Sequence, residues 1–69
     1  MLYYKVNKEH DNKQFGKKND MFYVADELFT ESECKKFNVN KAFCTPVEVS
    51  RNQTHWCFGA RFLNERFYK

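Results

Sequence analysis

The clearest alternation of hydrophobic and polar positions lies in residues 54–62, which read T-H-W-C-F-G-A-R-F. Successive side chains of a strand point to opposite faces of a sheet, so the run divides into two faces. The first face is almost entirely apolar and consists of Thr54, Trp56, Phe58, Ala60 and Phe62. The second face carries His55, Cys57, Gly59 and Arg61. The pattern predicts one strand whose first face lies in the core and includes the only Trp of the chain.

Residues 47–50 read V-E-V-S and predict a second strand that pairs with this one. A register that sets Val49 opposite Trp56 and Val47 opposite Phe58 puts both valines on the core face. A slip of one residue would turn them to the other face. The sequence therefore predicts a hairpin with a short polar turn around residues 51–54.

Residues 2–7 predict a first strand, with Leu2, Tyr4 and Val6 on one face. Residues 8–19 are polar and include a glycine, which predicts a long loop. Residues 20–25 are apolar on both faces, the pattern of a central strand that is covered on both sides.

A short helix is predicted to begin after Thr30. Thr30 and Glu33 have the spacing of a capping box, and Phe29 and Cys34 have that of a hydrophobic staple. A left-handed stop at Asn38 or Asn40 limits the helix to about two to three turns, so it needs tertiary contacts to be stable.

Together these segments predict a single small α+β domain over residues 1–69, in the order β-β-α-β-β. Its antiparallel sheet carries one short helix packed on it, and residues 63–69 form a flexible tail. The core of so small a domain supplies only about 3–5 kcal/mol, and natural mini-proteins add a staple. Thirteen aromatic residues compensate in part, and three cysteines are a second means.

An odd number of cysteines argues against a disulfide framework and for metal ligands or buried thiols. Structural zinc takes four nitrogen or sulfur ligands. The predicted set is Cys34, Cys44 and Cys57, with His55 or, as the alternative fourth ligand, His10. His55 and Cys57 project from one side of the predicted strand with Cα atoms ~6.5 Å apart, which suits a shared ion. The other interpretation is that all three thiols are inert core residues.

Other classes of function are less favoured. A nucleophilic Cys57–His55 pair has no orienting acid except Glu48, and no catalytic motif is present, so we expect a protein that is not an enzyme. Cations at Lys17, Lys18, Arg51, Arg61 and Arg66 suit phosphate contacts, yet the aromatics alternate as core residues do, which disfavours direct nucleic-acid binding. No segment approaches the ~20 apolar residues of a membrane span, and we expect a cytoplasmic protein.

Charge is distributed unevenly along the chain. Residues 20–34 contain five acids and no base, although the whole chain carries a net charge of +3. These acids are interpreted either as an ordinary solvated surface with a helix N-terminus or as a patch for a basic partner. In the second interpretation the partner-binding residues are Asp20, Asp26, Glu27 and Glu31.

Three segments carry a resemblance to a known group of proteins: residues 27–33 (E-L-F-T-E-S-E), residues 47–50 and residues 54–62. They resemble small proteins encoded by prophages and mobile elements of streptococci and related Firmicutes. Some proteins of this kind are type II-A anti-CRISPR proteins, and the three Cys and two His are similar to the zinc-containing sort. Apolar residues often stand in this group where the chain has Cys34, His55 and Cys57, so a zinc site would belong to this branch alone.

The resemblance implies a phage-encoded inhibitor that binds the type II RNA-guided CRISPR nuclease of the host in its cytoplasm. Such a protein blocks target DNA binding or a conformational step. The alternatives are a small nucleic-acid-binding or regulatory protein of a prophage and an interaction module without metal.

Overall fold

Strand β1 (Leu2–Val6) is the centre of the computed structural model, which describes residues 1–57 and 59–64. Its Tyr-Tyr-Lys-Val sequence favours extended backbone. One edge of β1 pairs antiparallel with β4 (Leu28–Phe29), and the other edge pairs antiparallel with β5 (Cys44–Glu48). The result is a three-stranded sheet in the order β4-β1-β5.

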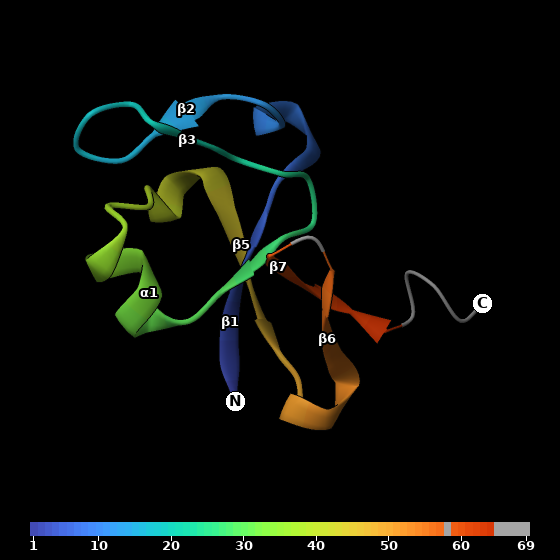
Figure 1. Ribbon diagram of the computed structural model, residues 1–69. Coiled ribbons are helices and arrows are strands. Elements are labelled where there is room, and N and C mark those ends of the chain that lie inside the picture. The colour runs from blue at the N-terminus through green and yellow to red at the C-terminus, as the bar shows by residue number, and fades with distance from the viewer. Residues whose placement is uncertain (58, 65–69) are drawn as a thin grey trace.

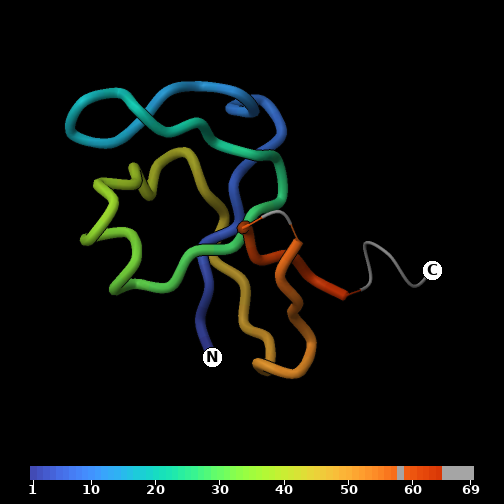
Figure 2. Tube along the Cα trace, in the orientation of Figure 1, coloured from blue at the N-terminus to red at the C-terminus, as the bar shows by residue number. Residues whose placement is uncertain are grey.

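Two separate antiparallel ribbons flank this sheet. One consists of β2 (Gln14–Phe15) and β3 (Met21–Phe22), and the other of β6 (Thr54–Cys57) and β7 (Ala60–Leu63). The β2–β3 ribbon and the β6–β7 hairpin lie toward opposite ends of the molecule (Figure 2). The connecting segments contain the 3-10 turns η1 (Lys8–His10), η2 (Lys41–Phe43) and η3 (Arg51–Gln53).

Helix α1 (Glu31–Lys36) begins as the sequence predicts. Thr30 Oγ1 accepts a hydrogen bond from the Glu33 N–H at 3.1 Å, and Glu33 Oε1 accepts one from the Thr30 N–H at 2.9 Å. The predicted stop is also confirmed, because Asn38 has φ 58° and is left-handed. The capping box and the left-handed stop thus define both ends of the helix.

Both faces of the central sheet are covered (Figure 1). Tyr4 and Val6 point toward α1 and the β2–β3 ribbon, where the main core lies. Tyr3 and Leu28 point the other way, toward the β6–β7 hairpin. The buried residues of the main core are Val6, Phe15, Tyr23, Phe29, Cys34, Val39 and Cys44.

These features confirm the predicted class, a small α+β domain with antiparallel sheets and one short helix. The first strand and the helix lie where they were predicted. Within the described ranges, no helix is long and apolar enough to cross a membrane.

The predicted hairpin of residues 47–62 is wrong. Strand β5 pairs with β1, so that Val47 lies opposite Tyr3. Residues 54–62 form two strands that pair with each other, with Trp56 opposite Arg61. Gly59 has φ 81°, a conformation that glycine adopts readily and that suits the reversal between Cys57 and Ala60. Alternation grouped Ala60 with Phe62, and both are buried, but it wrongly put Trp56 on the same face: Trp56 lies opposite Arg61 and is exposed. The expectations for Phe58 lie outside the described residues.

The prediction of a central strand over residues 20–25 is also wrong. Only β3 is a strand there, and its partner is β2, which lies in the predicted loop of residues 8–19. The central strand is β1, which pairs with β4 along one edge and with β5 along the other. Leu63 of the predicted tail ends β7, and residues 65–69 lie outside the described part of the chain.

Candidate functional site

Two of the predicted zinc ligands, Cys34 and Cys44, are core residues. Both are buried in the main core, and Cys44 Sγ lies 3.8 Å from the Asn40 carbonyl oxygen, to which it donates a weak hydrogen bond. Burial raises the pKa of the Cys34 thiol and raises that of Cys44 to about 11. In the metal-free protein both therefore stay protonated at neutral pH and behave as small apolar side chains.

The remaining candidates lie on other elements. Cys57 is half-buried at the end of β6. His55 Nδ1 lies 2.8 Å from the Asn64 side-chain oxygen. His10 stacks on Phe43 with ring centroids 4.0 Å apart, and its buried Nδ1 has no hydrogen-bond partner among the described residues.

The predicted zinc ligands do not form a ready-made site. Among residues 1–57 and 59–64, no three His, Cys, Asp or Glu side chains gather where they could hold one ion. Tetrahedral zinc needs four ligands at 2.0–2.3 Å, so the described side chains would have to move to form such a set. Zinc stays a prediction of the sequence. Elemental analysis of protein purified without added metal tests it: about one ion per chain, lost in Cys57→Ser, supports it.

The acids of residues 20–34 differ in their ion pairs and in their burial. Glu31 accepts a hydrogen bond from Lys41, which holds the pKa of Glu31 below its ordinary range. Glu33 accepts a hydrogen bond from Arg61 Nη1 at 3.0 Å. Burial raises the pKa of Glu27 to about 7. Asp20 and Asp26 have no ion-pair partner among the residues that the structure describes, and they lie at the two ends of the segment that includes β3.

Glu27→Gln is expected to stabilise the protein at alkaline pH. The folded state raises the pKa of Glu27 from about 4.5 to about 7, chiefly through burial, so it binds a proton more tightly than the unfolded chain. The free energy of folding that protonated Glu27 contributes is fully present below pH 4.5, and it is lost as the pH rises through about 7. After allowance for partial exposure, the gain from Gln at pH 8 is about 1 kcal/mol, seen as a higher melting temperature.

The gain should disappear at pH 4, where Glu27 and Gln are both neutral. Glu31→Gln is the matched control, because it removes the ion pair with Lys41 and should give no gain at pH 8. Equal melting temperatures for Glu27→Gln and wild type at pH 8 would contradict the prediction.

An apolar surface is present on the outer side of the β2–β3 ribbon. Phe22 is 52% exposed and Val24 is 39% exposed. The residue between them, Tyr23, is 2% exposed. The extended backbone alternates, so Phe22 and Val24 project on the side away from the core. Asp20 and Asp26 flank this pair in the chain, and we call residues Phe22 and Val24 with these two acids the ribbon surface.

A cleft lies between β1, the start of α1 and the β6–β7 hairpin, with a volume of about 450 Å³. Trp56 of β6 is 61% exposed at its edge, although the sequence predicts it in the core. The Arg61 guanidinium carbon lies 4.6 Å from the Trp56 ring centre and 5.2 Å from that of Tyr3. Arg61 thus links the exposed indole to the sheet, and we call this region the Trp56 cleft.

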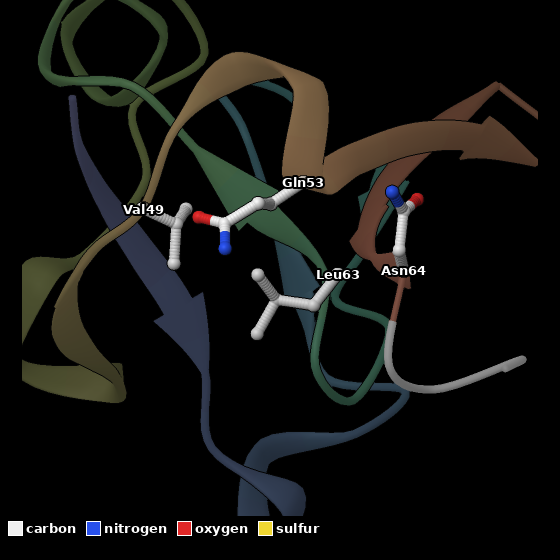
Figure 3. Close-up of a pocket in the computed structure, with 4 residues that line it drawn as sticks. All are labelled: Val49, Gln53, Leu63 and Asn64. Carbon is white, nitrogen blue, oxygen red and sulfur yellow. The ribbon is translucent and has the colours of Figure 1, made fainter. Parts of the chain in front are cut away.

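A smaller pocket of about 160 Å³ lies beside the turn η3. Figure 3 shows Gln53, whose amide group points toward Val49 and Leu63, with Asn64 at the edge. Its lining offers two amide groups but no acid, base or nucleophile, so it gives no support to catalysis there.

Comparison with known proteins adds no relative: no family model matches the chain, and no curated protein or solved structure matches it. Candidate sites therefore rest on this chain's own geometry.

Sequence reasoning missed the exposure of Phe22, Val24 and Trp56. One available signal was Gly59, which stands in the middle of the run 54–62 as a glycine does in a two-residue hairpin turn. Had the turn been placed there, Trp56 would have been assigned to a short outer hairpin. No local signal distinguishes Phe22 from its buried neighbour Tyr23, since both are large aromatics.

Proposed function

We propose that the chain is an anti-CRISPR protein that binds the type II RNA-guided nuclease of its host stoichiometrically, in the host cytoplasm. The observation that carries the proposal is the ribbon surface. Two adjacent outward side chains, Phe22 and Val24, are apolar and exposed, and acids flank them. This surface directly precedes residues 27–33, the first of the three segments that carry the resemblance.

The composition of the ribbon surface suits a protein partner. Interfaces combine an apolar centre with a polar rim, and aromatic residues are enriched at the centre. Phe22 and Val24 expose apolar surface on one side of the ribbon, and a partner that covered this surface would remove it from water.

The charge of the ribbon surface suits a basic partner. Within residues 1–57 and 59–64, Asp20 and Asp26 have no ion-pair partner. The heteroduplex of type II CRISPR nucleases lies in a positively charged channel. A small protein that places carboxylates at this channel and covers apolar surface beside it excludes target DNA by occupancy, and no covalent step is needed.

A cleavage assay tests this proposal. Guide-loaded type II nucleases from several streptococci are mixed with increasing amounts of the protein before labelled target DNA is added. We expect cleavage to end near a 1:1 ratio of protein to nuclease, since occupancy needs one molecule per site. Co-elution of the two proteins in size-exclusion chromatography gives an independent readout.

Two results would count against the proposal. Inhibition at far below equimolar protein would indicate an enzyme that modifies the nuclease. Full cleavage and no co-elution with every nuclease tested would mean that the chain has another target.

A further inference from the structure

We propose that the Trp56 cleft binds single-stranded nucleic acid, with a base stacked on Trp56 and a phosphate at Arg51. The cleft and the ribbon surface lie on different ribbons, at opposite ends of the molecule (Figure 2). This activity is separate from nuclease binding and does not depend on it.

The first element of the cleft is a stacking platform. Trp56 lies on the β6–β7 hairpin and has 61% of its surface exposed. Proteins that bind single strands without sequence preference use exposed aromatic rings, because every base has a π-face. The sequence argument against nucleic-acid binding assumed that the aromatics of this run are core residues, and the structure removes that assumption for Trp56.

The platform is held in place before any ligand binds. The Arg61 guanidinium lies against the Trp56 ring at 4.6 Å and the Tyr3 ring at 5.2 Å. Arg61 Nη1 donates a hydrogen bond to Glu33 Oε1 at 3.0 Å, and Glu33 is itself fixed by the capping box of α1. Preorganised side chains lose less entropy on binding, which favours a stable stack.

The second element is a cation for the phosphate. Arg51 lines the same cleft, and within the described residues it has no ion-pair partner. Its backbone is fixed by Thr54 Oγ1, which donates a hydrogen bond to the Arg51 carbonyl at 2.8 Å. The two arginines exceed the single carboxylate of the lining, Glu33, so the cleft attracts anions.

The combination favours a single strand over the other occupants. A duplex keeps its bases stacked on each other, so none is free to stack on Trp56. An acidic peptide would satisfy Arg51 but offers no planar group for the indole. A single strand supplies both the anion and the planar ring, and the cleft volume of about 450 Å³ exceeds that of one base.

Trp56 is the only Trp of the chain, so its fluorescence reports directly on the cleft. We expect a 15-nucleotide oligothymidine to quench this fluorescence saturably at low salt, with an affinity that falls as the salt concentration rises. Trp56→Ala, followed by anisotropy of a labelled oligonucleotide, should lower the affinity by about ten-fold or more.

Arg51→Glu and Lys17→Glu form a matched pair, since they make the same charge change in the cleft and on the distant β2–β3 loop. Arg51→Glu should weaken binding by about ten-fold, and Lys17→Glu by much less. Circular dichroism verifies that both variants are folded.

Several outcomes would overturn the inference: no quenching of the wild-type protein, equal losses for Arg51→Glu and Lys17→Glu, or tighter binding of duplex DNA. Displacement of the oligonucleotide by an equal concentration of polyglutamate would assign the cleft to an acidic protein segment instead. Each readout uses the isolated protein, so a failure in the nuclease assay leaves this test intact.

Discussion

Tyr23→Ala is expected to unfold the domain at 25 °C. The Tyr23 ring is 2% exposed, stacks on Phe15 with centroids 4.2 Å apart and meets Phe43 edge-on at 5.7 Å. Its hydroxyl oxygen accepts a hydrogen bond from the Asn40 N–H at 2.9 Å. Truncation of a buried aromatic costs about 3–5 kcal/mol, which equals the whole stability of a domain of this size. Circular dichroism and urea denaturation provide the measurement.

Tyr23→Phe is the matched control. It keeps the ring and its stacking but removes the acceptor of the hydrogen bond from the Asn40 N–H, so we expect a loss of about 1 kcal/mol and a folded protein. A cooperative transition for Tyr23→Ala within a few degrees of wild type would show that the contact with Phe15 is not central to the core.

Phe22→Asp is expected to have the opposite profile: normal folding and the loss of nuclease binding. Phe22 points outward and is 52% exposed, so a carboxylate there removes no core contact. At the interface the substitution removes the aromatic contact, and an aromatic at the centre of an interface is worth about 2 kcal/mol or more. We expect affinity for the guide-loaded nuclease to fall by about 30-fold or more, measured by biolayer interferometry.

Leu2→Asp controls for the added charge, because Leu2 is another exposed apolar residue, on β1 rather than on the ribbon surface. It should bind the nuclease nearly as wild type does. Equal losses in both variants would point to net charge, and normal binding by Phe22→Asp would move the interface elsewhere on the protein.

The contrast between Phe22 and Tyr23 marks a limit of sequence reasoning. Residues 20–25 are apolar at nearly every position, so alternation cannot say which side faces the core. The structure decides for Tyr23 because its ring completes the cluster with Phe15 and Phe43, contributed by β2 and η2. Because successive side chains of an extended segment point to opposite sides, Phe22 then points outward.

The acids and thiols show a similar limit. Five acids in residues 20–34 indicate a patch, but Lys41 and Arg61 come from distant segments to pair with Glu31 and Glu33. The cysteines have a zinc-like composition, yet Cys34 and Cys44 pack in the core while Cys57 lies on the separate β6–β7 hairpin. Residue types were available from the sequence, but their distances were not.

The sequence by itself determined the features whose chemistry is local. The capping box of Thr30 and Glu33 and the left-handed Asn38 join groups a few residues apart, so the same residues form them wherever the helix packs. The α+β class and the first strand were likewise predicted from local properties, the strand and helix propensities of the residues and the spacing of the hydrophobic positions.

Only the tertiary structure decided which strands pair. Residues 47–50 can pair either with residues 54–62, which follow them closely, or with β1 at the start of the chain. In the structure Val47 and Glu48 pair with β1. Backbone hydrogen bonds are nearly the same for either pairing, so the choice depends on the side chains that each arrangement buries. Pairing with β1 buries Tyr3 and Val6, and it leaves residues 54–62 to fold on themselves and expose Trp56.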